Sequence, residues 1–97
     1  MTNADILTIL KSDLDIAATS TTKDTLLTNL ISLATAAITR EGITLTDPLT
    51  TEEGTLIEMY AAFLYRKRKE ATQTMPQSLR YMLNNMLLQQ KARLLNE

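Results

Sequence analysis

The segment MYAAFLY, residues 59–65, is apolar on every side of a helix and is followed directly by the cations RKRK, residues 66–69. A helix that is apolar all round packs against neighbours on several faces. We therefore expect this segment to form the middle of a central helix. Thr50 and Glu53 have capping-box spacing, so the helix is expected to begin just after Thr50.

Two shorter periodic segments precede this central helix, at about residues 3–15 and 23–41. Each carries apolar residues three and four positions apart, the pattern of a helix with one buried face. Gly42 follows the second segment, where a left-handed C-terminal cap suits glycine. The expected N-terminal caps are Thr2 or Asn3, and Thr21 or Thr22. The apolar stripes are Ile6, Leu7, Leu10 and Leu14, then Leu27, Leu30, Ile31, Ala34, Ala37 and Ile38.

A fourth helix is expected after Pro76, because proline is well tolerated in the first turn of a helix. Residues 43–50 and 70–75 are expected to be the connecting loops. The fourth helix carries two apolar stripes on nearly opposite sides. The first, Leu79, Met82, Leu83, Met86 and Leu87, is expected to face the core. The second, Tyr81, Leu88 and Leu95, is either incidental exposure or a candidate subunit interface. No strand pattern competes, so the expected fold is all-α, a single small four-helix domain over residues 1–97.

The composition restricts the class of protein. A chain of 97 residues with 44% hydrophobic residues is long enough for one globular core. The net charge of −1 excludes a generally basic nucleic-acid-binding protein. Residues 1–49 hold six acids and three bases, net −3, whereas residues 50–97 hold five acids and seven bases, net +2. Attraction to a polyanion must therefore come from the second half of the chain.

The start of the chain, MTNADILTIL, lacks the positive charge and the apolar run of a signal peptide. No stretch approaches the roughly 18 apolar residues of a membrane span. We therefore expect a soluble chain that is made in the cytosol.

The residue types used in most active sites are missing. The chain has no histidine and no cysteine, which removes the usual general base, the thiol nucleophile and the soft metal ligands. Asp13 and Asp15 are two apart and would not face each other on a helix, and Glu52 and Glu53 suit the first turn of one. We expect no enzyme, no metal site and no cofactor.

The basic cluster Arg66, Lys67, Arg68 and Lys69 admits two interpretations. Four successive helical residues sweep about 300° around the axis, so these cations cannot all face one groove. Cations are also favoured in the last turn of any helix by its dipole. The cluster is thus either a solvated helix end or a band of charge, independent of sequence, for phosphates or an acidic partner.

The chain resembles the small head–tail connector proteins of long-tailed phages, which are also called head-completion or adaptor proteins. The resemblance lies in ITREGITL (38–45), in IEMYAAFLYRKRKE (57–70) and in MPQSLRYMLNNMLLQQK (75–91). The order of the expected elements agrees as well, so the resemblance covers nearly the whole chain.

This resemblance implies a structural phage or prophage subunit that forms a homo-oligomeric ring, a dodecamer in the virion, beneath the portal protein. Such a ring extends the DNA channel, contacts packaged DNA non-specifically and carries the next tail-side head-completion protein. The expected location is the virion, after synthesis in the bacterial cytoplasm. Within a ring, the cations 66–69 would form a repeated charge band, and Tyr81, Leu88 and Leu95 become candidate contacts between subunits. The alternative is a small helical nucleic-acid-binding or regulatory protein of phage origin.

Overall fold

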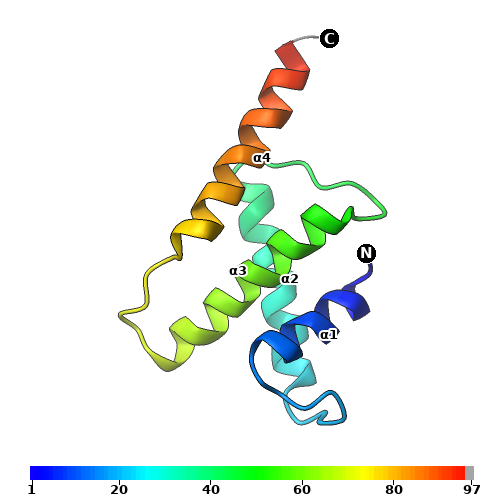
Figure 1. Ribbon diagram of the computed structural model, residues 1–97, viewed down its shortest axis with the longest axis vertical. Coiled ribbons are helices and arrows are strands. Elements are labelled where there is room, and N and C mark those ends of the chain that lie inside the picture. The colour runs from blue at the N-terminus through cyan, green and yellow to red at the C-terminus, as the bar shows by residue number, and fades with distance from the viewer. Residues whose placement is uncertain (96–97) are drawn as a thin grey trace.

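The apolar segment of residues 59–65 lies in α3 (Thr51–Lys69), which is the central helix of the structure (Figure 1). The computed structural model describes residues 1–95 and places α1 (Asn3–Asp13), α2 (Asp24–Arg40) and α4 (Gln77–Leu95) in contact with α3. Within these residues all regular secondary structure is helical. The prediction of an all-α, four-helix domain is therefore confirmed. Residues 96–97 of the expected domain lie outside the described residues.

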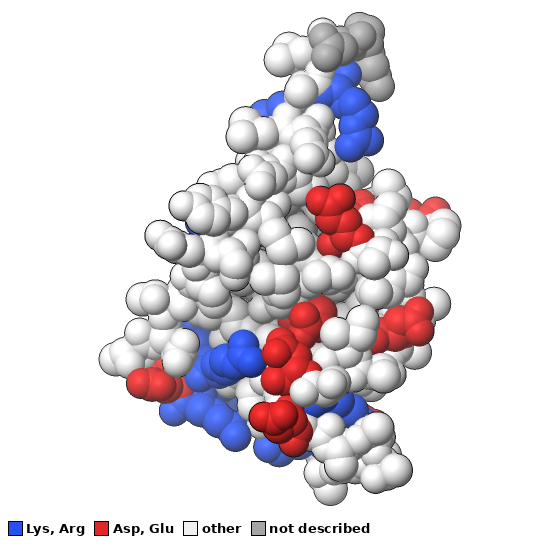
Figure 2. Space-filling view, viewed as in Figure 1, with Lys and Arg blue, Asp and Glu red and all other residues white. Residues whose placement is uncertain are grey.

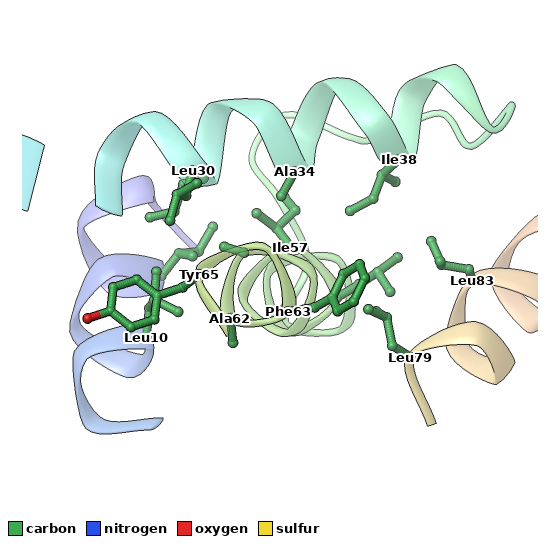
Figure 3. Packing of buried hydrophobic residues seen from close by; sticks show 14 of the residues in the cluster. Leu10, Leu30, Ala34, Ile38, Ile57, Ala62, Phe63, Tyr65, Leu79 and Leu83 are labelled. Atoms are coloured by element: carbon green, nitrogen blue, oxygen red, sulfur yellow. The ribbon is translucent and has the colours of Figure 1, made fainter. Parts of the chain in front are cut away.

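The core surrounds α3 on three sides (Figure 3). Leu30, Ala34 and Ile38 project from α2 onto one side of α3, while Tyr65 points toward α1 and Phe63 toward α4. This arrangement explains why α3 is apolar all round: three neighbouring helices remove three of its faces from water. The residues of α3 buried in this way are Leu56, Ile57, Ala61, Ala62, Phe63 and Tyr65.

The start of α3 is fixed by the expected capping box. Thr50 Oγ1 accepts a hydrogen bond from the backbone N–H of Glu53 at 3.1 Å, and Glu53 Oε1 accepts one from Thr50 N–H at 2.9 Å. Glu53 also accepts hydrogen bonds from the backbone N–H and the hydroxyl of Thr46 in the preceding loop. Burial raises the pKa of Glu53, but these hydrogen bonds outweigh it and hold the pKa below its usual value. A single carboxylate therefore caps the helix and anchors the loop.

The caps of the first two helices differ from each other. Thr2 caps α1 in a capping box with Asp5, as expected. At α2 the predicted threonine caps are wrong, because Lys23 occupies the cap position and no side chain bonds there. Two tertiary contacts fix this end instead: Lys23 Nζ donates to the Tyr65 hydroxyl at 2.7 Å, and Asp24 lies 2.6 Å from Lys11 Nζ.

The other expected boundaries are close to those observed. Gly42 follows α2 with a positive φ of 104°, which confirms the left-handed conformation predicted there. Pro76 directly precedes α4 and accepts the first helical hydrogen bond, from the backbone N–H of Arg80 at 3.1 Å. The proline therefore lies one position before the first turn predicted for it, where its missing N–H leaves no bond unmade.

Only the first half of α4 is packed on the rest of the molecule. Leu79, Leu83 and Met86 are buried, and Met82 and Leu87 are half-buried, so the predicted core face is confirmed. From residue 88 onward every side chain of α4 except Gln90 is exposed. This second half, residues 88–95, extends past the other helices at the top of Figure 1 and is called the α4 arm below. Within residues 1–95, no helix has the length and apolar character needed to cross a membrane.

Candidate interaction surfaces

The four cations of the basic cluster occupy the last turn of α3, where three of them make contacts within the chain. Arg66 Nη2 lies 3.4 Å from Asp13 Oδ1 of α1. Lys67 Nζ lies 5.7 Å from the centre of the Phe63 ring, and Lys69 Nζ lies 4.9 Å from that of Tyr65. Both distances suit cation–π contacts. Arg68 has no ion pair or cation–π contact with the described residues.

These contacts limit what the basic cluster can present to a partner. Figure 2 shows cations and acids side by side at the end of the molecule where α3 ends. Lys67 and Lys69 remain exposed despite their aromatic contacts. Arg66 is partly neutralised by Asp13. The end of α3 therefore presents a moderate positive charge from residues 67–69 rather than four equivalent cations.

A shallow groove lies beside these cations, between α2 and α3. It holds about 430 Å³ and is called the α2–α3 groove below. Leu33, half-exposed, lies at its edge, and Lys67 and Arg68 lie along its rim. Its remaining lining is Leu26, Asn29, Leu30 and Leu64. The groove is therefore apolar with a positive rim, which suits an apolar partner of negative or neutral charge.

A buried carboxyl group lies near the middle of α3. Glu58 is 5% exposed, and its Oε1 has no hydrogen-bond partner among the described residues. Burial, a hydrogen bond with Asp13 and the negative charge of Asp13 raise the pKa of Glu58 to about 8, although Arg66 lowers it. Glu58 is therefore mostly protonated at neutral pH, in a cluster with Asp13 and Arg66.

Sequence analysis did not identify this carboxyl cluster. The available signal was the position of Glu58 directly before the segment 59–65, where a helix buried on all sides has no solvated face for an acid. Asp13 and Asp15 do not form a pair, as expected: Asp13 ends α1, and Asp15 lies beyond it with φ 58°. The partner of Asp13 is instead Glu58, which is 45 positions away in the sequence.

The outer side of α4 carries the second apolar stripe. Tyr81, Leu88 and Leu95 are 61%, 63% and 86% exposed, so nothing in the described chain covers the candidate subunit interface. Leu94, which sequence analysis did not single out, is 70% exposed. The stripe could be predicted because it lies nearly opposite the core face of α4. Leu94 is exposed for a different reason, because the arm extends past the other helices. The arm is thus a helix with apolar residues on several sides and no packing partner.

The charges of α4 are all positive, since its sequence contains no acidic residue. Its first cation, Arg80, is held by two hydrogen bonds to the carboxylate of Glu41 at the end of α2. The other two, Lys91 and Arg93, lie on the exposed arm. The α4 arm therefore combines exposed leucines with positive charge.

The base of the arm is held by one side chain. Gln90 Oε1 accepts a hydrogen bond from Thr44 N–H at 2.9 Å, and Gln90 Nε2 donates one to Thr44 O at 2.8 Å. The pair joins α4 to the loop between α2 and α3. It borders a second groove of about 380 Å³, which is also lined by Glu52, Glu53 and Arg93. Gln90 therefore sets the direction in which the arm leaves the body.

Replacing Gln90 with alanine is expected to lower the free energy of unfolding by about 1 kcal/mol, because two partly solvated hydrogen bonds are lost. Hydrogen exchange of the residue 88–95 amides should also become faster, since the arm loses its attachment. Gln89→Ala is the matched control, because Gln89 is exposed and makes no such bonds. Equal stability and exchange in the two variants would contradict this role of Gln90.

Within residues 1–95 no group of three or more His, Cys, Asp or Glu side chains is placed to hold a metal ion. The chain matches no known family model, no curated protein and no solved structure. The candidate interaction surfaces that the described residues form are the charged end of α3, the α2–α3 groove and the α4 arm.

Proposed function

We propose that this chain is a non-catalytic structural subunit of a phage or prophage, which forms a homo-oligomeric ring under the portal and joins the head to the tail. The ring extends the DNA channel and completes the head after packaging, so the protein works in the virion. Its partners are copies of itself, the portal protein, the next tail-side protein and, non-specifically, the packaged DNA.

The observation that carries this proposal is the α4 arm. Leu88, Leu94 and Leu95 project on a helix that no other described part of the chain covers. Two free turns of helix gain little stability by themselves, because most helical stability in proteins comes from packing. An exposed apolar helix on an otherwise well-packed domain is typical of a subunit that is completed by a neighbour. The order and form of the four helices also agree with those expected from the resemblance.

The positive end of α3 gives this proposal a second support. One copy presents only a few exposed cations at residues 67–69, which suit weak contact with phosphates and no particular base sequence. A ring repeats these cations in every copy, and the contacts then act together through their effective concentration. Modest charge on one subunit is therefore compatible with substantial charge on the assembly.

The direct test is electron microscopy of this protein mixed with the portal protein encoded in the same genome. We expect rings of the small protein on one face of the portal, and sedimentation of the dilute protein alone should show monomers or small variable assemblies. Failure to bind the portal, together with tight sequence-selective binding of the monomer to duplex DNA, would refute the proposal. That outcome would favour the regulatory alternative.

A further inference from the structure

We propose that the α4 arm of one copy packs across the outer face of α1 in the next copy, so that the ring is built from one repeated arm-to-α1 contact. This inference rests on the proposed function insofar as it concerns a ring. The contact itself is a statement about two copies of this chain and can be tested without a portal.

The surface that the arm offers is defined by three residues on one side of the helix. Leu88, Lys91 and Leu95 are spaced three and four apart, which places them within about 60° of each other around the axis. All three are exposed. The arm therefore presents two leucines with a cation between them. Arg93 points away from this side, because it is two positions, or about 200°, from Lys91.

The outer face of α1 has the complementary arrangement. Asp5, Ile9 and Asp13 are spaced four apart and lie on one side of α1. Ile9 is 41% exposed, Asp5 is exposed, and the Asp13 side chain is 40% exposed although Arg66 lies beside it. This face therefore presents one apolar residue between two acids. Antiparallel packing with Lys91 beside Asp5, or parallel packing with Lys91 beside Asp13, places Leu88 of the arm beside Ile9.

Charge decides between this face and a second exposed apolar surface of the body, the α2–α3 groove. Leu33 provides the apolar surface there, but Lys67 and Arg68 lie on its rim. The arm carries cations and no acids, so it would meet charges of its own sign in the groove. Like charges brought together at an interface oppose association, whereas opposite charges steer it. The acidic α1 face is therefore the better partner for the arm.

The arrangement of the helices makes this contact intermolecular and directional. In Figure 1 the arm extends from one end of the molecule, whereas α1 lies near the other end. An arm therefore cannot reach α1 of its own chain. A contact that joins two different surfaces is heterologous, and successive heterologous contacts generate a ring when the rotation between copies closes. The spacing also fits, since the step from Leu88 to Lys91 spans about 5 Å and the steps from Ile9 to Asp5 and to Asp13 span about 6 Å.

The chain contains no cysteine, so engineered cysteines give a clean test by oxidative cross-linking. The double variant Ile9→Cys with Leu88→Cys should form a ladder of covalent oligomers beyond the dimer, at high protein concentration and low salt. Each single variant should stop at traces of dimer, because neither cysteine meets its own counterpart. Peptide mapping should recover the 9–88 disulfide as the main cross-linked species. Rising salt should reduce the ladder, as expected for a contact steered by charge.

Three further variants identify the surfaces. Lys91→Glu in the double-cysteine chain should reduce the ladder several-fold, whereas Arg93→Glu, which makes the same charge change on the far side of the arm, should retain most of it. The variant Leu33→Cys with Leu88→Cys tests the α2–α3 groove and should give no ladder. A ladder from this groove variant, an 88–88 dimer as the main product, or no ladder from the 9–88 variant would overturn the proposal. These cross-linking outcomes do not depend on portal binding, which is tested by electron microscopy. The arm-to-α1 contact and the proposed function can therefore fail independently of each other.

Discussion

Replacing Glu58 with glutamine is expected to raise the free energy of unfolding by about 3 kcal/mol at pH 9 and to change it little near pH 5. The pKa of Glu58 is about 8 in the folded protein, against an ordinary value of 4.5. Each unit of difference corresponds to about 1.4 kcal/mol, and about 3 kcal/mol is a discounted figure because the folded state can relax around the charge. Glutamine is neutral at every pH and has nearly the same shape, so it avoids the cost of burying a charge.

The direction of the pH dependence follows from the raised pKa. Between pH 4.5 and 8 the folded protein retains the Glu58 proton, whereas the unfolded chain has released it. The stabilising contribution of this group is therefore complete below about pH 4.5 and is lost as the pH rises toward 8. Asp13 and Arg66 are the charged groups that face Glu58. Asp5 and Glu53 have lowered pKa values, so their contributions are lost only in more acidic solution.

Urea unfolding followed by circular dichroism at pH 5, 7 and 9 measures this effect. The parent protein should become less stable with each step, while Glu58→Gln should show a much flatter profile. Glu52→Gln is the matched control, since Glu52 is an exposed acid of the same helix. A parent protein that is as stable at pH 9 as at pH 5, with no gain from Glu58→Gln, would show that Glu58 is not a buried protonated acid.

The α3 helix could be predicted closely because its determinants are local. The run of residues 59–65 and the spacing of Thr50 and Glu53 depend only on neighbours in the sequence, and both are confirmed. The same is true of the two faces of α4, which follow from helical periodicity. Periodicity shows which side of a helix is apolar, and for Leu79 and Leu83 that side is indeed the buried one.

The features that could not be predicted depend on contacts between distant parts of the chain. The buried carboxyl cluster joins Glu58 to Asp13, and the cap of α2 is replaced by the bond from Lys23 to Tyr65. Local sequence predicts a cap at Thr21 or Thr22, but a tertiary contact fixes the helix end without one. Of the partners of the basic cluster, Asp13 was inaccessible for the same reason, because it lies on α1. Phe63 and Tyr65 lie four positions before Lys67 and Lys69, so helical spacing could have indicated these two contacts.

These contacts change what the basic cluster is expected to do when it is mutated. Arg66 balances the carboxyl cluster, so its replacement affects the pKa of Glu58 and the packing of α1. Lys67, Arg68 and Lys69 face solvent and aromatic rings, and their charges are available to a partner. We therefore separate Arg66→Gln from the triple replacement of residues 67–69 by glutamine. The first variant tests the fold and the second tests the proposed charge band.

The triple variant is expected to stay folded, with a free energy of unfolding within about 1–2 kcal/mol of the parent, because exposed cation contacts contribute about 0–1 kcal/mol each. Arg66→Gln should instead raise the pKa of Glu58 further, since it removes the group that lowers it. The free energy of unfolding of Arg66→Gln should therefore fall furthest below that of the parent above about pH 8, where Glu58 must ionise. Urea unfolding of both variants at pH 6 and 9 separates the two effects.

In the proposed assembled particle, the triple variant is expected to have the larger effect and Arg66→Gln the smaller one. The free subunit should bind short duplex DNA weakly and without sequence preference, and the triple variant should lose most of this binding, with a flatter dependence on salt. The ring that we propose would repeat the loss in every copy, so under the proposed function a phage carrying the triple variant should yield far fewer infectious particles, whereas Arg66→Gln should retain most of the yield near neutral pH. Plaque titres measure the yield, and electron microscopy shows whether DNA-filled heads lack tails. A normal titre from the triple variant would mean that residues 67–69 only solvate the end of α3, and would leave the α4 arm as the main determinant of assembly.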